Sequence, residues 1–209
     1  MKTHTRIAFV FAALLLGKVT LLAGDATAGK ALYNTCLACH GMNGEGNPAL
    51  KSPAVNNLSE KYIIAQLEKF ANKQRGADPK DVAGITMAPM AMMVPTPEAK
   101  ANVAAYIATL EGPKPPATLT GGNPEKGKVL YATCAACHGP DGKGMDQLNA
   151  PSLVNQHDWY QLTQLKNFKD GIRGAHPQDI TGATMRPMAM MLTDEQAMKD
   201  VIAYLQSLE

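Results

Sequence analysis

Aromatic side chains are scarce in this chain of 209 residues: they make up 5% of it, against 45% for hydrophobic residues as a whole. A soluble globular protein of this composition has a largely aliphatic core with few rings to fill it. Cysteine is equally sparse, and the four present are Cys36, Cys39, Cys134 and Cys137. All four lie in two short motifs, so none is left for a disulfide elsewhere.

A basic excess is also missing once the N-terminal segment is set aside. The whole chain has 20 basic and 18 acidic residues. Lys2, Arg6 and Lys18 precede residue 24, so a chain cut there keeps 17 basic residues against 18 acidic ones. Nucleic-acid binding needs a concentrated basic surface. We therefore expect no nucleic-acid partner.

Residues 1–23 are typical of an export signal, with a basic start, an apolar run over residues 7–17 and small residues after it. Lys18 ends the apolar run well short of the roughly 20 residues that cross a bilayer. Asp25 stands where a lipoprotein signal would carry its acylated cysteine. We expect cleavage after residue 23, or as late as residue 28, export to the periplasm, and at most peripheral membrane association.

The sequence is internally duplicated. A shift of 98 residues carries residues 29–111 onto residues 127–209 without a gap, and it aligns YNTCLACHG with YATCAACHG. Each copy has 83 residues, the size of a small domain. Residues 112–126 between the copies hold four prolines and a pair of glycines, which predict a semi-rigid, extended linker. The expected domains are therefore residues 24–111 and 127–209.

Each copy predicts three helices and no substantial sheet, because no stretch alternates with a period of two. In the first copy residues 29–35 lead into the cysteines, and residues 60–73 place apolar side chains at helical spacing. The third helix begins after Thr96, with proline at its first position. In the second copy Thr193 is the expected N-cap, and Gln196 completes a capping box. The expected fold class is all-α.

Cys-x-x-Cys-His is the pattern of c-type haem attachment, in which two thiols add across the porphyrin vinyl groups and the histidine reaches the iron. The motif comprises Cys36, Cys39 and His40 in the first copy and Cys134, Cys137 and His138 in the second. A lone CxxC could also bind zinc or act as a dithiol redox pair. Zinc needs four ligands in one closed site, whereas these motifs occur twice in register, so we favour haem. Haem would also supply the core that such small domains lack.

A six-coordinate iron needs a second axial ligand. Each copy offers a methionine-rich segment for it, TMAPMAMM at residues 86–93 and TMRPMAMM at residues 184–191. Methionine clusters are usually flexible core filler. A thioether sulfur nevertheless binds haem iron, and a His/Met pair raises the reduction potential. We expect one methionine of each segment to be a ligand.

Together these features resemble the dihaem class I cytochromes c, and most closely the cytochrome c4 family, over the signal and both copies. The resemblance implies two tandem cytochrome c domains, each a small helical fold around one covalent haem c, with the ligand methionine on a loop before the last helix. That family places its ligand before an x-Pro step. The implied metal ligands are His40, Met87, His138 and Met185. Met90 and Met188 stay open as alternatives.

The same family crosses its first and last helices through a small residue against an aromatic ring. Gly29 with Tyr106, and Gly127 with Tyr204, match this pattern. The resemblance therefore implies a packing role for these four residues.

Several ionisable residues lie outside the motifs. Arg75 and Arg173 correspond in the repeat and could bind haem propionates or be ordinary surface charges. His157 and His176 have no histidine counterpart in the first copy, so we expect surface or propionate-side positions for them. Arg186 follows the implied ligand of the second copy, where the first copy has alanine. Its charge favours ferrous iron, so haem two is expected to have the higher potential.

Two coordinatively saturated irons predict a one-electron carrier. Haem enzymes such as a peroxidase or a thiosulfate-oxidising dehydrogenase need an open or labile coordination position, or an unusual ligand such as cysteine. No free cysteine is available for that purpose, so we expect an electron-transfer protein and not an enzyme. Quinol-oxidising complexes, dehydrogenases and terminal oxidases are the expected redox partners. The alternative is a haem-bearing subunit of a larger oxidoreductase, such as a flavocytochrome dehydrogenase.

Overall fold

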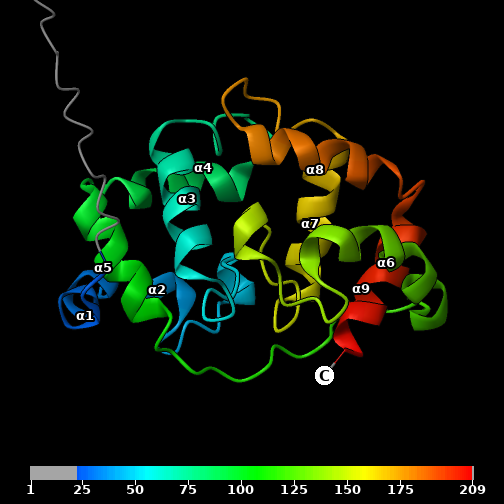
Figure 1. Ribbon diagram of the computed structural model, residues 1–209, viewed down its shortest axis with the longest axis horizontal. Coiled ribbons are helices and arrows are strands. Elements are labelled where there is room, and N and C mark those ends of the chain that lie inside the picture. The colour runs from blue at the N-terminus through cyan, green and yellow to red at the C-terminus, as the bar shows by residue number, and fades with distance from the viewer. Residues whose placement is uncertain (1–22, 209) are drawn as a thin grey trace, which may run out of the picture.

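The computed structural model describes residues 23–208, and the expected export signal lies almost entirely outside them. Figure 1 shows two helical domains side by side, joined by an extended segment along one edge. The described part of the chain contains no strand, and two isolated antiparallel bridges join Asn47 to Ser52 and Met145 to Ala150. The all-α fold class is confirmed.

The helices of the first domain are α1 (Ala26–Tyr33), α2 (Leu37–His40), α3 (Glu60–Ala71), α4 (Val82–Ala91) and α5 (Pro97–Ile107). Those of the second are α6 (Pro124–His138), α7 (Asp158–Lys169), α8 (Ile180–Met190) and α9 (Glu195–Gln206). A 3-10 turn precedes the long middle helix of each domain, at Pro48–Leu50 and Asp146–Leu148. None of the helices within residues 23–208 is both long and apolar enough to cross a bilayer.

In each domain the first helix packs on the last one, α1 on α5 and α6 on α9. A glycine permits this close crossing: a Cβ on Gly29 would lie 1.9 Å from the backbone oxygen of Asn102 and 2.8 Å from the Cβ of Tyr106. A Cβ on Gly127 would lie 2.9 Å from the Cβ of Tyr204. Real Cβ atoms do not come so close to other atoms, so both predicted glycine–tyrosine contacts are confirmed.

The last helix of each domain, α5 or α9, has an N-cap side chain, and the sequence predicted only the cap of α5 correctly. Thr96 caps α5 by accepting a hydrogen bond from the backbone of Ala99, as expected. The prediction that Thr193 caps α9 was wrong, because the carboxylate of Asp194 takes that place. Gln196 does not close a capping box and donates instead to Asp200. An ionised carboxylate is both a good N-cap and a favourable charge at a helix N-terminus.

The methionine-rich segments lie in helices, α4 and α8, and the expectation of a loop was wrong. Asp81 caps α4 by accepting from the backbone of Gly84, and Asp179 caps α8 in the same way. Alanine and methionine, which favour helix, make up about half of each of these two helices. Pro89 lies near the end of α4, so the proline costs few of its backbone hydrogen bonds.

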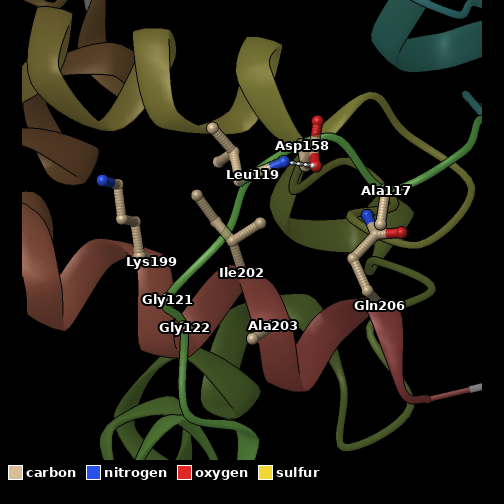
Figure 2. A pocket seen from close by; sticks show the side chains of 9 residues that line it. All are labelled: Ala117, Leu119, Gly121, Gly122, Asp158, Lys199, Ile202, Ala203 and Gln206. Atoms are coloured by element: carbon tan, nitrogen blue, oxygen red, sulfur yellow. Dashed lines mark hydrogen bonds between the residues drawn. The ribbon is translucent and has the colours of Figure 1, made fainter.

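The segment between the domains is bound to the second one. Asp158, the first residue of α7, accepts hydrogen bonds from the backbone nitrogen and hydroxyl of Thr118 and from the nitrogen of Leu119. Figure 2 shows this carboxylate beside a cavity of about 220 Å³ between the segment and α9. No residue that lines this cavity is an expected haem residue.

Candidate functional site

Both CxxCH motifs lie at the end of a domain's first helical segment. Cys36 precedes α2 and Cys39 lies within it, while Cys134 and Cys137 belong to the last turns of α6. Residues three apart on a helix are neighbours on one face, so each pair of thiols can reach one edge of a porphyrin. Burial raises the pKa of the Cys36 and Cys134 thiols, which keeps them protonated at neutral pH. A thioether forms by adding such an S–H group across a vinyl double bond.

The two motif histidines are buried and held in the same way. The Nδ1 atom of His40 lies 2.9 Å from the backbone oxygen of Pro53, and that of His138 lies 2.9 Å from the oxygen of Pro151. A carbonyl oxygen can only accept, so Nδ1 carries the proton and Nε2 keeps a free lone pair for a metal. Burial lowers the pKa of both rings, although the hydrogen bond acts in the opposite direction. Both imidazoles therefore stay neutral, as iron ligation requires.

The turn after each histidine is fixed by the first helix. The hydroxyl of Tyr33 donates to the backbone oxygen of Gly41 at 2.9 Å, and Tyr131 donates to Gly139 at 2.7 Å. Both glycines have a positive φ, 83° and 78°, which other residues adopt at a cost. These bonds anchor the peptide next to each candidate iron ligand.

The methionines differ in burial. Met87 is half-buried and packs against the same core cluster as Cys36, whereas Met90 is 44% exposed. Met185 is half-buried too, and so is Met188. The other methionines of the two segments, Met92, Met93, Met190 and Met191, are exposed. Burial thus favours Met87 in the first domain and leaves two candidates in the second.

These residues fit a haem better than a bare metal ion. Within residues 23–208, no three side chains among His, Cys, Asp and Glu are grouped to hold a metal ion by themselves. The zinc alternative therefore has no closed site there. A porphyrin would supply four nitrogen ligands of its own and leave only the two axial positions to the protein.

A network of six side chains joins the domains, and its members come in pairs that are 98 residues apart. They are Tyr62 and Tyr160, Gln66 and Gln164, and Arg75 and Arg173. Arg75 donates to Tyr160 at 2.8 Å, and Arg173 donates to Tyr62 at 3.1 Å, so each guanidinium reaches across to the opposite domain. Figure 1 places α3 and α7, which carry the tyrosines and glutamines, on the inner sides of their domains. The contacts have an approximate twofold relation.

Arg75 and Arg173 are only 8% and 7% exposed, which excludes the surface-charge alternative and leaves the propionate alternative open. Their hydrogen-bond partners within residues 23–208 are neutral side-chain oxygens, and the Nε atom of each is buried without a partner. Burial acts to raise the pKa of Tyr62, but the two guanidiniums outweigh it and the pKa lies below its ordinary value. Two buried cations without a carboxylate partner suit anionic groups such as haem propionates.

The histidines outside the motifs have different surroundings. His157 is buried, and its Nε2 atom donates to the backbone oxygen of Glu45 in the other domain at 2.9 Å. Of the two positions expected for His157, surface or propionate side, burial excludes the surface. His176 is half-buried and accepts a hydrogen bond from the backbone of Gln178. Sequence periodicity gave no signal for the contact of His157, because its partner lies 112 residues away.

The family model for cytochrome c matches this chain twice, over residues 26–111 and 124–209. Cytochrome c4 of Pseudomonas aeruginosa is 30% identical over 158 residues, which cover 72% of this chain and 74% of that protein. Cytochrome c4 of Stutzerimonas stutzeri is 29% identical over 194 residues, or 89% of this chain and 90% of that one. This chain belongs to the cytochrome c4 family. The cytochrome accordingly carries two covalent haem c groups and is a dihaem electron carrier.

The solved structures agree with this assignment. Reduced cytochrome c4 from Pseudomonas stutzeri matches with a TM-score of 0.69 at 27% identity, over 90% of this cytochrome and 100% of that chain. Another relative, the thiosulfate dehydrogenase electron acceptor of Thiomonas intermedia, is 32% identical over 171 residues, or 78% of this cytochrome and 73% of that protein. The two tandem cytochrome c domains expected from the repeat are thereby confirmed.

Proposed function

We propose that this cytochrome is a one-electron carrier in which each iron is held between an imidazole and a thioether, with no position open to a substrate. The observation that carries the proposal is the duplicated, buried histidine whose Nδ1 atom is bound to a backbone carbonyl. Cys36 and Cys39 would attach haem one, with His40 and Met87 as its axial ligands. Cys134 and Cys137 would attach haem two, with His138 and Met185. The haem supplies the ferric/ferrous couple, and the protein fixes the ligands and excludes enzymatic chemistry at the iron.

Arg75 and Arg173 would bind propionates of the two haems at the domain interface. Their burial and their lack of carboxylate partners within residues 23–208 support this assignment. Each guanidinium contacts both domains, so propionates bound there would bring the two haems toward one another. Such an arrangement suits electron transfer between the haems, with one domain receiving electrons and the other delivering them.

The mature cytochrome would begin after residue 23 and act in the periplasm. Asp25 caps α1 by accepting from the backbone of Thr27, and a Cβ on Gly24 would lie 2.1 Å from the backbone oxygen of Ala101. A cut as late as residue 28 would remove both contacts, which favours the earlier site. The domains would be residues 24–111 and 127–209. Of the linker at residues 112–126, the last three residues already belong to α6.

Dehydrogenases are the electron donors that the comparisons support, because one relative is named as the electron acceptor of a thiosulfate dehydrogenase. Quinol-oxidising complexes are further candidate donors, and terminal oxidases are candidate acceptors. A second candidate function is a haem-bearing part of a larger oxidoreductase. It is supported by a thiosulfate dehydrogenase from Marichromatium purpuratum, which matches 87% of this cytochrome but 40% of its own chain, with a TM-score of 0.69 and 27% identity. Constant co-purification with a dehydrogenase would favour this second function.

The deciding experiment is a visible spectrum of the exported protein in both redox states. We expect two covalent haems per chain and the weak long-wavelength band of methionine-ligated ferric haem. Met87→Ala and Met185→Ala should each remove about half of that band and lower one potential by on the order of 0.1–0.3 V, within the roughly 0.8 V range that axial ligands span. Met90→Ala and Met188→Ala are the matched controls and should keep the band. Ready binding of carbon monoxide to the reduced protein at neutral pH would contradict the proposal.

A further inference from the structure

The two domains differ at the N-terminus of their long middle helix. The second domain has Gln156 and His157 there, and the first domain has Leu58 and Ser59 at the matching positions. Ser59 caps α3 through its hydroxyl, which accepts from a backbone nitrogen of the first turn. His157 is the N-cap residue of α7 and makes no capping hydrogen bond. Both side chains of the second domain are buried, and both point into the first domain.

Gln156 binds both polar groups of one residue in the other domain. Its Oε1 atom accepts from the nitrogen of Ala54 at 3.0 Å, and its Nε2 atom donates to the oxygen of Ala54 at 2.9 Å. Ala54 is fully buried and follows Pro53, whose carbonyl accepts the Nδ1 proton of His40. The nitrogen of Ala54 belongs to the same peptide group as the carbonyl of Pro53, so the glutamine fixes both the peptide that accepts from His40 and the peptide that follows it.

His157 binds the other segment that holds the same ligand. Its Nε2 atom donates to the backbone oxygen of Glu45 at 2.9 Å, and a Cβ on Gly46 would lie 2.8 Å from that Nε2 atom. The backbone nitrogen of Gly46 donates to the backbone oxygen of His40 at 2.7 Å. Two neighbouring side chains of the second domain thus hold the two backbone segments beyond the CxxCH motif that are hydrogen-bonded to His40.

The reverse support is weaker within the described residues. His138 has the same partners in its own domain, the carbonyl of Pro151 and the nitrogen of Gly144. The first domain reaches this loop through two side chains. The Nδ2 atom of Asn57 donates to the oxygen of Val154 at 2.9 Å, three residues beyond the proline. The exposed Nζ atom of Lys61 donates to the oxygen of Asp146 at 2.6 Å, two residues beyond Gly144. Leu58 has no polar group to offer, and the hydroxyl of Ser59 is used within α3. The cross-domain support is therefore unequal.

We propose that Gln156 and His157 are positioning residues for the axial histidine of haem one, supplied by the domain that carries haem two. This inference rests on the proposed role of His40 as an iron ligand. The hydrogen bond from Nδ1 to a carbonyl orients a ligating imidazole and makes it a stronger donor to the metal. Docking of the second domain would thereby influence the electron donation of His40 to the first iron, whereas the described contacts of the first domain do not reach the proline that accepts from His138.

The test is Gln156→Leu in the full, haem-loaded protein, which places the first domain's residue in the second. Loss of the two hydrogen bonds between Gln156 and Ala54 weakens the hydrogen bond between His40 and Pro53, so the imidazole stabilises ferric iron less well. We expect the potential of haem one to rise and that of haem two to stay unchanged. Proton NMR of the ferric protein should show shifted haem-one methyl resonances and unshifted haem-two resonances. The two haems are assigned beforehand from Met87→Ala and Met185→Ala.

Two further variants keep the result interpretable. His157→Ser restores a capping residue to α7, so it is expected to fold well and still to move the haem-one resonances alone. Gln196→Leu is the matched control, because this glutamine bonds to Gly121 and Asp200 and not to the first domain, and it should move neither set. Unchanged haem-one signals in both test variants, or equal shifts at both haems, would overturn the inference. If the spectra still show methionine bands for both haems, the proposed function survives that result.

Discussion

The two domains of this cytochrome repeat one another closely at the CxxCH motifs and in the arginine network between them, and they diverge at the N-terminus of the middle helix. The bonds from the motif histidines to a proline carbonyl have the same length, 2.9 Å, in both. The glycine crossings and the tyrosine bonds to the turn are duplicated as well. The polar contacts of Gln156, His157 and Asp158 occur only in the second domain, where they bind the first domain or the linker. Haem attachment is thus a property of each domain, while the contact between the domains combines matched and unmatched positions.

Even a difference in secondary structure leaves the attachment site unchanged. α6 runs unbroken to His138, whereas α1 ends at Tyr33 and a turn separates it from α2. Asn34 follows α1 where the second copy has Ala132, and asparagine is a weaker helix former than alanine. Both segments nevertheless end at a histidine followed by a glycine with positive φ. The geometry at the haem is therefore set by the turn and its partners more than by helix continuity.

The shared framework predicts equal damage when either helix crossing is blocked. Gly29→Val and Gly127→Val should each lower the free energy of unfolding by about 3–5 kcal/mol, because any Cβ meets a backbone oxygen at 1.9 Å in both domains. Denaturant unfolding of the haem-loaded protein measures this. Gly121→Ala is the control: its Cβ would have no atom within 4 Å, but its φ is 82°, so a cost of about 1–2 kcal/mol is expected. If only one of the two valine variants lost unfolding free energy, the two helix crossings would not be equivalent.

The linker contact predicts unequal effects at matched positions. Asp158→Ala removes the acceptor of the hydrogen bonds from Thr118 and Leu119, so we expect a loss of about 2–4 kcal/mol in unfolding free energy at pH 7. Glu60→Ala, the first-domain counterpart, should cost less than about 0.5 kcal/mol, because Glu60 is exposed. If Asp158→Ala lowered the unfolding free energy no more than Glu60→Ala does, the hydrogen bonds between Asp158 and the linker would contribute nothing to stability.

The same contact has a pH dependence. Burial acts to raise the pKa of Asp158, but hydrogen bonds from Leu119 and Thr118 outweigh it, and the pKa lies below its ordinary value. A carboxyl group with a lowered folded-state pKa stabilises the fold above its unfolded pKa of about 3.9 and loses that effect as the pH falls through the folded value. The difference between wild type and Asp158→Ala should therefore be full at pH 7 and shrink below about pH 4. Unfolding measured at both pH values checks this.

The smallest predicted effect concerns the difference in potential between the haems. Arg186 is half-buried next to Met185, and alanine occupies the matching position in the first domain. At a separation of about 10 Å and a dielectric of roughly 20–80, Coulomb's law gives about 0.4–1.7 kcal/mol, or tens of millivolts for one electron. Arg186→Ala should lower the potential of haem two by that amount in a redox titration. Ala88→Arg should raise the reduction potential of haem one. If neither variant changed a potential, the difference between the haems would not come from the charge of Arg186.

Sequence patterns predicted the features that depend on neighbours along the chain. The CxxCH motifs and the Thr96 cap follow from short spacings, and the resemblance to the cytochrome c4 family implied the glycine crossings. The structure has the cap and the crossings as expected. The helices α4 and α8 were missed because their methionines were taken as loop ligands, although Asp81 and Asp179 are N-caps that could have signalled them.

The sequence by itself determined that two haems are attached, one to each copy, because each copy has within five residues the two thiols that form the thioether bonds and a histidine for the iron. The tertiary structure alone decided which polar side chains leave the solvent. Arg75 and Arg173 are unremarkable in the sequence and become buried cations between the domains. Gln156 and His157 find partners 102 and 112 residues away. Local spacing cannot encode such contacts, because they exist only after two folded domains have docked.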